Sequence, residues 1–181
     1  ALGATIFGST YVGIYPTNGS EEAHHIFKLA NTSVLIVQNY KLLENIKINY
    51  PLKQIVLYED EPKTSEYRGI PIASYDYFVA GSKQFWPDVR REAKDIITYI
   101  MTSGTTGRSK AVKISYDNIS YTCNEMSQIY QLKNERIVSY LPLSHIAASM
   151  MDIFLHFYHQ GTIYFAKPDA LQGSLVDTLK I

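Results

Sequence analysis

Short apolar runs alternate with amphipathic stretches along most of this chain. The runs Val34–Val37, Gln54–Tyr58 and Ile96–Met101 are almost continuously apolar, as in strands that a parallel sheet buries on both faces. Two further runs, 137–141 and 161–165, have the same character. Strands separated by helical segments in this order predict parallel βαβ units, with helices on both faces of the sheet. The pattern therefore predicts an α/β fold.

Between these runs, apolar residues recur at the spacing of helices. Ser20 can cap a helix in which Glu21 and Glu22 occupy the first turn, where they oppose the positive end of the helix dipole. Residues 59–94 contain three prolines and many charges, so we expect surface loops there. The other predicted helices cover 1–13, 40–48 and 75–80, together with the apolar stripes Ile119–Cys123–Met126–Tyr130, Ile146–Met150–Ile153–Phe157 and Leu171–Leu175–Leu179.

Residues 102–110 read Thr-Ser-Gly-Thr-Thr-Gly-Arg-Ser-Lys and follow the apolar run that ends at Met101. Glycines allow the backbone to approach an anion, and successive backbone N–H groups in such a turn form an anion-binding concavity. The hydroxyl groups add donors, and Lys110 supplies a positive charge for a terminal phosphate. This composition predicts a phosphate-binding loop, here called the phosphate loop. The alternative is a surface turn rich in Ser, Thr and Gly.

The spacing within the phosphate loop excludes two common phosphate-binding motifs. A Walker A loop that began at Gly104 would need its second glycine at Ser109. A dinucleotide-binding fingerprint would need a second glycine at Thr106. The phosphate loop therefore belongs to another class.

The phosphate loop resembles that of the adenylate-forming enzymes, which include acyl-CoA synthetases, luciferases and the adenylation domains of peptide synthetases. Their pattern is close to T-S-G-T-T-G-x-P-K-G. This chain departs from it at Ser109, where proline is usual, and at Ala111, where glycine is usual. We expect Ala111 to adopt strand dihedral angles, because strand-like residues follow it directly. Segments 13–18, 139–148 and 165–175 extend the likeness, which is closest to the bubblegum-type long-chain fatty-acyl-CoA synthetases.

This resemblance implies a ligase of fatty acid metabolism, a long-chain fatty acid–CoA ligase. ATP and the fatty acid would first give an acyl-adenylate and pyrophosphate, and coenzyme A would then give the thioester. The resemblance makes Thr102 the candidate Mg²⁺ contact and His145 a candidate for the acyl pocket. The alternative for His145 is a locally hydrogen-bonded histidine at a helix N-terminus. The implied ATP phosphate-binding residues are Thr102, Ser103, Gly104, Thr105, Thr106, Gly107, Arg108, Ser109 and Lys110.

The resemblance further implies that residues 1–181 are part of the N-terminal, AMP-binding domain, with no internal domain boundary and with both ends cut from a longer chain. The family's magnesium-binding glutamate, ribose-binding aspartate, hinge and C-terminal lysine would then lie beyond Ile181. With no complete catalytic set, this chain alone is expected to be inactive. The alternative is a degenerate or truncated paralogue that serves as a binding or interaction module. An unrelated phosphate-binding protein is a third possibility.

Composition adds limits on partners and location. The 17 basic and 17 acidic residues give a formal net charge of zero, which argues against a nucleic-acid partner. The one cysteine, Cys123, permits no intrachain disulfide, fits a reducing compartment and is expected to be buried. No apolar run reaches the roughly 18 residues of a transmembrane helix. The resemblance implies a cytoplasmic protein and leaves peripheral association with the endoplasmic reticulum or another intracellular membrane open.

Three further groups of polar residues have simpler structural interpretations. His156 and His159 lie three residues apart and could share a metal, but no third ligand is nearby in the sequence, which favours a helix end. The adjacent His24 and His25 are expected to point apart on a helix. The acidic residues 59–61 precede Pro62 and are expected to form a solvated turn.

Overall fold

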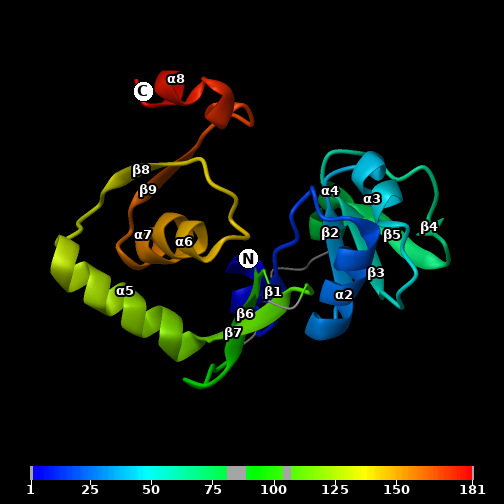
Figure 1. The fold of residues 1–181 in the computed structure, drawn as a ribbon, viewed down its shortest axis with the longest axis horizontal. Coiled ribbons are helices and arrows are strands. Elements are labelled where there is room, and N and C mark those ends of the chain that lie inside the picture. The colour runs from blue at the N-terminus through cyan, green and yellow to red at the C-terminus, as the bar shows by residue number, and fades with distance from the viewer. Residues whose placement is uncertain (1, 81–88, 104–106, 181) are drawn as a thin grey trace. The chain divides into compact units, whose positions relative to one another are not determined.

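The computed structural model of the chain describes residues 2–80, 89–103 and 107–180. Its residues group into two compact units, each of which is drawn from separate parts of the sequence (Figure 1). The first unit contains Ala1–Gly13, Arg90–Thr102 and Val112–Ile181, and the second contains Ile14–Val89 and Ser103–Ala111. The prediction of one N-terminal domain without an internal boundary stays a prediction, and each unit is described by itself.

The second unit is built on a four-stranded sheet in the order β2-β3-β5-β4 (Figure 1). Strands β2 (Val34–Val37), β3 (Gln54–Leu57) and β5 (Ile70–Ser74) run parallel, and the short β4 (Glu66–Tyr67) pairs antiparallel with β5. In β2, Leu35 and Val37 are buried while their neighbours Val34 and Ile36 are exposed, so one face of this strand carries the core.

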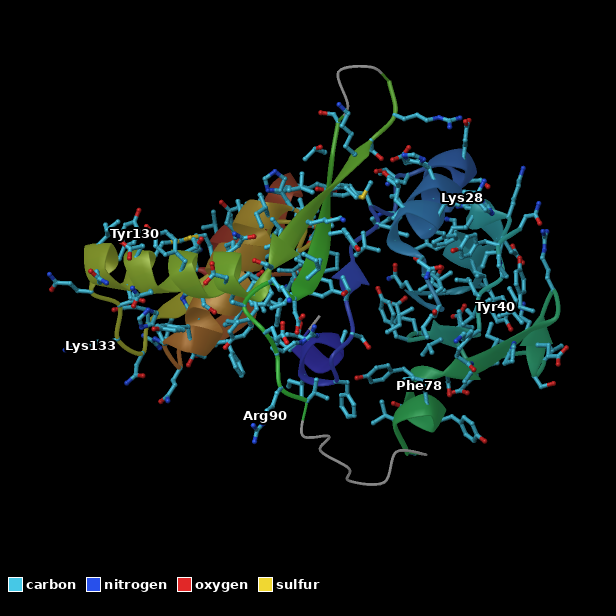
Figure 2. All side chains as sticks on the ribbon, turned by 90° about the horizontal axis from the view of Figure 1, so that it is seen from below. Lys28, Tyr40, Phe78, Arg90, Tyr130 and Lys133 are labelled. Atoms are coloured by element: carbon cyan, nitrogen blue, oxygen red, sulfur yellow. The ribbon has the colours of Figure 1, made fainter. Side chains whose placement is uncertain are left out.

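Helices α2 (Ser20–Ala30) and α3 (Tyr40–Ile46) contribute to the core of the second unit. Ala23 and Phe27 of α2 and Leu43 of α3 are fully buried, in a cluster with Leu35 and Leu57 of the sheet. This burial follows the apolar stripe of the sequence, and the exposed Lys28 lies in the last turn of α2 (Figure 2). The short α4 (Tyr75–Ala80) follows β5 directly, as predicted.

The first unit contains two small sheets. One has the order β1-β6-β7, formed by β1 (Tyr11–Val12), β6 (Ile96–Thr102) and β7 (Lys110–Ser115), of which β1 and β6 are parallel. The first two residues of β7 group with the second unit. The other sheet pairs β8 (Arg136–Ser139) parallel with β9 (Thr162–Phe165).

Helix α5 (Tyr116–Tyr130) begins at a capping box and packs through its apolar stripe. The Ser115 hydroxyl accepts a hydrogen bond from the Asn118 N–H at 3.2 Å, and the Asn118 side chain accepts one from the Ser115 N–H at 3.0 Å. Ile119 and Cys123 are buried with Ile97 of β6, whereas Tyr130 is exposed at the end of the helix (Figure 2). The remaining helices are α1 (Leu2–Ile6), α6 (Ile146–Ala148), η1 (Ser149–Leu155), α7 (His156–Tyr158), η2 (Ala170–Gln172) and α8 (Leu175–Thr178).

The α/β class and the parallel pairing are confirmed, but two predicted segments differ. The helix expected over 1–13 ends at Ile6, because the chain turns at Gly8 with φ 77° and then forms β1 against β6. The loops expected over 59–94 contain β4 and β5, although Pro71 lies within β5. The 146–157 helix forms, with η1 wound as a π-helix, a form that is rare except as short insertions in α-helices.

Candidate functional site

The phosphate loop connects β6 to β7, as the sequence predicts. Strand β6 is buried along Ile97, Thr98 and Ile100, and it becomes exposed at Thr102, where the loop begins. Strand β7 begins at Lys110, which is exposed. Of the predicted phosphate-binding residues, Gly104, Thr105 and Thr106 lie outside the described residues. The described part therefore places two hydroxyl residues, Thr102 and Ser103, at one end of the loop and a lysine at the other.

Gly107 has a backbone conformation that favours glycine, with φ 102°. A Cβ atom added to it would meet nothing within 4 Å, so the backbone angle is what restricts this position to glycine. Ala111 instead lies within β7 and is absent from the positive-φ residues, which confirms the prediction of strand dihedral angles. The departure from the family's glycine at Ala111 therefore adds no backbone strain.

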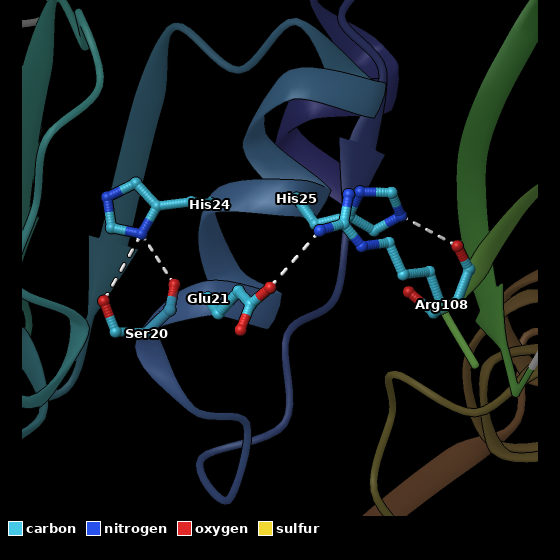
Figure 3. A network of polar contacts seen from close by, with 6 residues as sticks. Ser20, Glu21, His24, His25 and Arg108 are labelled. Carbon is cyan, nitrogen blue, oxygen red and sulfur yellow. Dashed lines mark hydrogen bonds and ion pairs between the residues drawn. The ribbon is translucent and has the colours of Figure 1, made fainter.

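Three side chains in the first half of α2 contact the phosphate loop at Arg108 and Ser109, and Figure 3 shows those of Glu21 and His25. The Arg108 guanidinium pairs with the Glu21 carboxylate at 3.3 Å, and both side chains are exposed. The Ser109 hydroxyl donates to the Glu22 carboxylate, and the His25 Nε2–H donates to the Ser109 carbonyl at 2.9 Å. Glu22, His25 and Ser109 are half-buried, so water screens these two bonds less than it screens the Arg108–Glu21 pair.

His24 and His25 bond to different partners, as expected for neighbours that point apart on a helix (Figure 3). The His24 Nε2 accepts a hydrogen bond from the Asn49 N–H at 2.9 Å, so the proton of a neutral ring lies on Nδ1. That Nδ1–H donates to the Ser20 carbonyl at 2.6 Å. His24 therefore stabilises the second unit locally, and only His25 reaches the phosphate loop.

His145 forms a local hydrogen bond at a helix N-terminus, which was the alternative interpretation of this residue. It is the N-cap of α6, and its Nδ1 accepts a hydrogen bond from the Ala147 N–H at 3.2 Å. The side chain is exposed. This bond leaves the outer ring nitrogen, Nε2, available to carry a proton. The acyl-pocket assignment of His145 stays a prediction.

The segment before His145 contacts Gly13, which follows β1, and Ser149 of η1, and sequence reasoning missed both contacts. A Cβ atom added to Gly13 would lie 2.8 Å from the Ser144 Cα, so this contact requires glycine. Ser149 donates its hydroxyl to the Leu143 carbonyl at 2.5 Å. The backbones at Gly13 and Ser144 thus lie close together within the first unit, although the two residues are far apart in the sequence. One sign in the sequence indicated that these segments are related: residues 13–18 and 139–148 both match motifs of the adenylate-forming enzymes.

Tyr11 links β1 to two neighbouring elements of the first unit, β6 and η1. Tyr11 of β1 lies opposite Thr98 of β6 in the sheet. Burial raises the pKa of Tyr11 above its ordinary value of 10.0, and hydrogen bonds with the Thr98 and Ser149 side chains partly oppose the rise. Tyr11 therefore stays protonated near neutral pH and joins β1 and β6 to η1.

The residues considered as metal ligands have separate partners. His156 is buried and donates its Nδ1–H to the Met151 carbonyl at 2.6 Å, whereas the His159 Nε2 bonds the Ser127 hydroxyl. Cys123 is buried, as predicted, and burial raises the pKa of its thiol. Within the described ranges, no three His, Cys, Asp or Glu side chains gather closely enough to hold a metal ion.

The acidic turn 59–61 has a more definite structure than the solvated turn expected from the sequence. The Asp60 carboxylate accepts a hydrogen bond from the Tyr40 N–H at 2.8 Å, at the start of α3. The Gln38 side chain donates to the Glu59 carboxylate at 2.6 Å. The Lys63 ammonium lies 4.9 Å from the centre of the Tyr40 ring. The turn thus stabilises the N-terminus of α3, where the helix dipole favours negative charge.

A family model described as AMP-binding enzyme matches residues 1–180. Over 99% of its length, the chain is 37% identical to the long-chain-fatty-acid–CoA ligase ACSBG2 of Xenopus laevis, of which it covers 26%. It is 38% identical to human ACSBG2 and 32% identical to the long-chain-fatty-acid–CoA ligase heimdall of Drosophila melanogaster, and it covers 28% of each. The chain thus spans about a quarter of the length of these relatives.

Solved structures show the same fold at lower identity. The anthranilate CoA ligase AuaEII, in complex with anthranoyl-AMP, matches 96% of the chain with a TM-score of 0.80 and 20% identity, and the chain covers 34% of it. ATP-bound MatB from Rhodopseudomonas palustris matches 97% of the chain with a TM-score of 0.70 and 16% identity, again with 34% of that protein covered. Among the described residues, the structure contains no helix that is both long and apolar enough to cross a membrane.

Proposed function

The chain belongs to the family of AMP-binding enzymes, and from this membership we propose that it forms part of a long-chain fatty acid–CoA ligase. The observation that carries the proposal is the phosphate loop, which joins a buried strand to Lys110 through a glycine at φ 102°. The curated relatives, which are long-chain-fatty-acid–CoA ligases, support the choice of substrate class. ATP, fatty acid and coenzyme A are the proposed substrates, and the cytoplasm is the proposed location.

In the first proposed step, a carboxylate oxygen of the fatty acid attacks the α-phosphorus of ATP and pyrophosphate leaves. The phosphate loop must hold the polyphosphate and stabilise the charge that develops on the leaving group. Lys110 would provide a cation, and the hydroxyls of Thr102 and Ser103 would provide donors. In the second step, the sulfur of coenzyme A attacks the acyl carbonyl and AMP leaves.

The donor set at the start of the loop suits a magnesium ion bound with ATP. Thr102, an exposed residue at the end of β6, carries a hydroxyl oxygen. Mg²⁺ prefers oxygen ligands, which include the phosphates of a bound substrate. Thr102 is therefore the proposed contact, and the ion when bound would neutralise phosphate charge. Arg108 is paired with Glu21 in an exposed ion pair.

The ligase is preferred over a degenerate binding module because of Ala111. A strained Ala111 would have indicated a damaged loop, but its strand conformation leaves Lys110 at a regular strand start. Acyl contact by His145 and peripheral membrane association remain parts of the proposal that rest on the resemblance to the relatives.

The test is fatty-acid-dependent release of pyrophosphate by the full-length protein that carries this chain, measured over fatty acids of increasing length. Long-chain acids should support release, and Lys110→Ala should lower the specificity constant for ATP about ten- to a hundredfold, the loss expected for a charge-assisted contact. The KM for fatty acid should change little. A folded Lys110→Ala variant with an unchanged ATP specificity constant would remove Lys110 from the site.

A further inference from the structure

Ser109 is bonded through both its side chain and its backbone. Its hydroxyl donates to Glu22. Its carbonyl accepts from His25, which Figure 3 shows, and both partners belong to α2. The two contacts, here called the α2 anchor, therefore fix the residue that directly precedes Lys110. Because its acceptor is a carboxylate, the Ser109–Glu22 hydrogen bond is stronger than a bond between neutral groups.

The α2 anchor occurs where the chain lacks a stiffening residue. The related enzymes usually have proline at position 109, and proline restricts φ and lowers the conformational entropy that a loop loses when it is ordered. Serine has no such restriction. Two hydrogen bonds to a helix that is itself packed through Ala23 and Phe27 can supply the missing restraint.

The charges on α2 argue against direct contact with ATP. Glu21 and Glu22 are both acidic, and a carboxylate beside a polyphosphate would be repelled by it. Glu22 can therefore assist a phosphate site only through another residue. The hydrogen bond from Ser109 provides that connection.

We propose that Glu22 and His25 are positioning residues, which hold Ser109 in place of the usual proline and so position Lys110 for the phosphates of ATP. The inference rests on the proposed function, because it needs the loop to bind phosphate. The exposed Arg108–Glu21 pair is a minor part of this arrangement, because water screens it.

The decisive experiment is rescue by proline in the full-length protein. Glu22→Ala should raise the KM for ATP about tenfold and leave the KM for fatty acid unchanged, since a bond to a charged group is lost. In the Glu22→Ala background, Ser109→Pro should restore the KM for ATP to within about twofold of the wild type. His25→Ala should produce a smaller rise, which Ser109→Pro should also reverse. Glu44→Ala removes an exposed carboxylate from α3 of the same unit and is the matched control.

A second readout does not depend on activity. Trypsin cleaves after Arg108, and loss of the α2 anchor should speed cleavage of the Arg108–Ser109 bond several-fold in Glu22→Ala but not in Glu44→Ala. A structural defect of α2 alone would lower the unfolding midpoint, and proline at position 109 would not repair it.

The outcomes separate this inference from the proposed function. If Lys110→Ala leaves ATP use unchanged, the phosphate site itself is wrong. If Lys110→Ala impairs ATP use but Glu22→Ala does not, or if Ser109→Pro fails to rescue Glu22→Ala, the α2 anchor is overturned while the proposed function stands. Reversal of the defect by proline together with faster cleavage at Arg108 supports the anchor.

Discussion

Replacement of Gly107 by alanine tests the conformation of the phosphate loop most directly. Gly107 has φ 102°, and a Cβ atom there would meet nothing within 4 Å. The substitution therefore introduces backbone strain without a steric clash against neighbouring groups. For an L-residue forced into left-handed backbone conformations this strain is about 1–2 kcal/mol.

We expect this strain to raise the KM for ATP more than it lowers the free energy of unfolding. Residue 107 is exposed, so in the absence of ATP the alanine variant can relax to negative φ, and its free energy of unfolding should fall by less than the full strain. To bind phosphate, the loop of the variant must return to positive φ at residue 107, and the strain of that conformation then opposes ATP binding. The KM for ATP should therefore rise by a factor of about 5–30, which corresponds to 1–2 kcal/mol.

The assay is pyrophosphate release at saturating fatty acid, with ATP varied, together with denaturant unfolding of each variant. Gly19→Ala is the control, because Gly19 also has open space for a Cβ atom but has φ −69°. It should leave the KM for ATP unchanged and lower stability by about 0.5–1 kcal/mol, because glycine is preferred to alanine at an N-cap. A folded Gly107→Ala variant with the ATP KM of the wild type would refute the reasoning that the loop acts in this conformation.

Three further predictions concern packing, pH and the chain by itself. Gly13→Ala should lower the free energy of unfolding by about 1–3 kcal/mol through the close approach of Ser144, while Gly3→Ala, which has open space, should not; equal effects in denaturant unfolding would disprove the contact. Because the folded-state pKa of Tyr11 is raised, its contribution to stability is complete below pH 10.0 and is lost as pH rises through the folded value, so Tyr11→Phe should make stability fall less steeply above pH 10.0. An unchanged slope in alkaline unfolding would contradict this. The 181-residue chain alone should show no fatty-acid-dependent exchange between pyrophosphate and ATP, and measurable exchange would show that it holds a complete site.

Local pattern was enough for most elements and for the place of the loop between β6 and β7. Strands β3 and β6 were readable because a strand buried in a parallel sheet must be apolar along its length. The apolar run of β2 also marked a strand, but its expected burial on both faces was wrong, because Val34 and Ile36 are exposed. Helices α2 and α5 were readable because their buried residues recur at helical spacing. The position of the loop between β6 and β7 was predicted correctly, and Ala111 was placed correctly by the strand residues after it. That the loop binds phosphate stays a prediction.

The short strands depended on partners far away in the sequence. Tyr11 and Val12 form β1 because Thr98 and Tyr99 of β6 offer a free strand edge, and the small residues before them suggested a helix instead. The same holds for β4 and β5, where proline and charged residues hid the pairing. Two residues, as in β1 and β4, carry too little pattern to identify a strand without its neighbour, and Pro71 interrupts the pattern of β5.

The connections around the candidate site were decided by the tertiary structure alone. The sequence assigned Glu21 and Glu22 to the helix dipole, which accounts for their place in the first turn of α2, but gave no sign that they contact Arg108 and Ser109. A hydrogen bond between residues 87 positions apart leaves no local periodicity, because it depends on how the folded chain brings them together. Residue types and spacing thus determined the chemistry that the loop can offer, and long-range packing determined which side chains hold it.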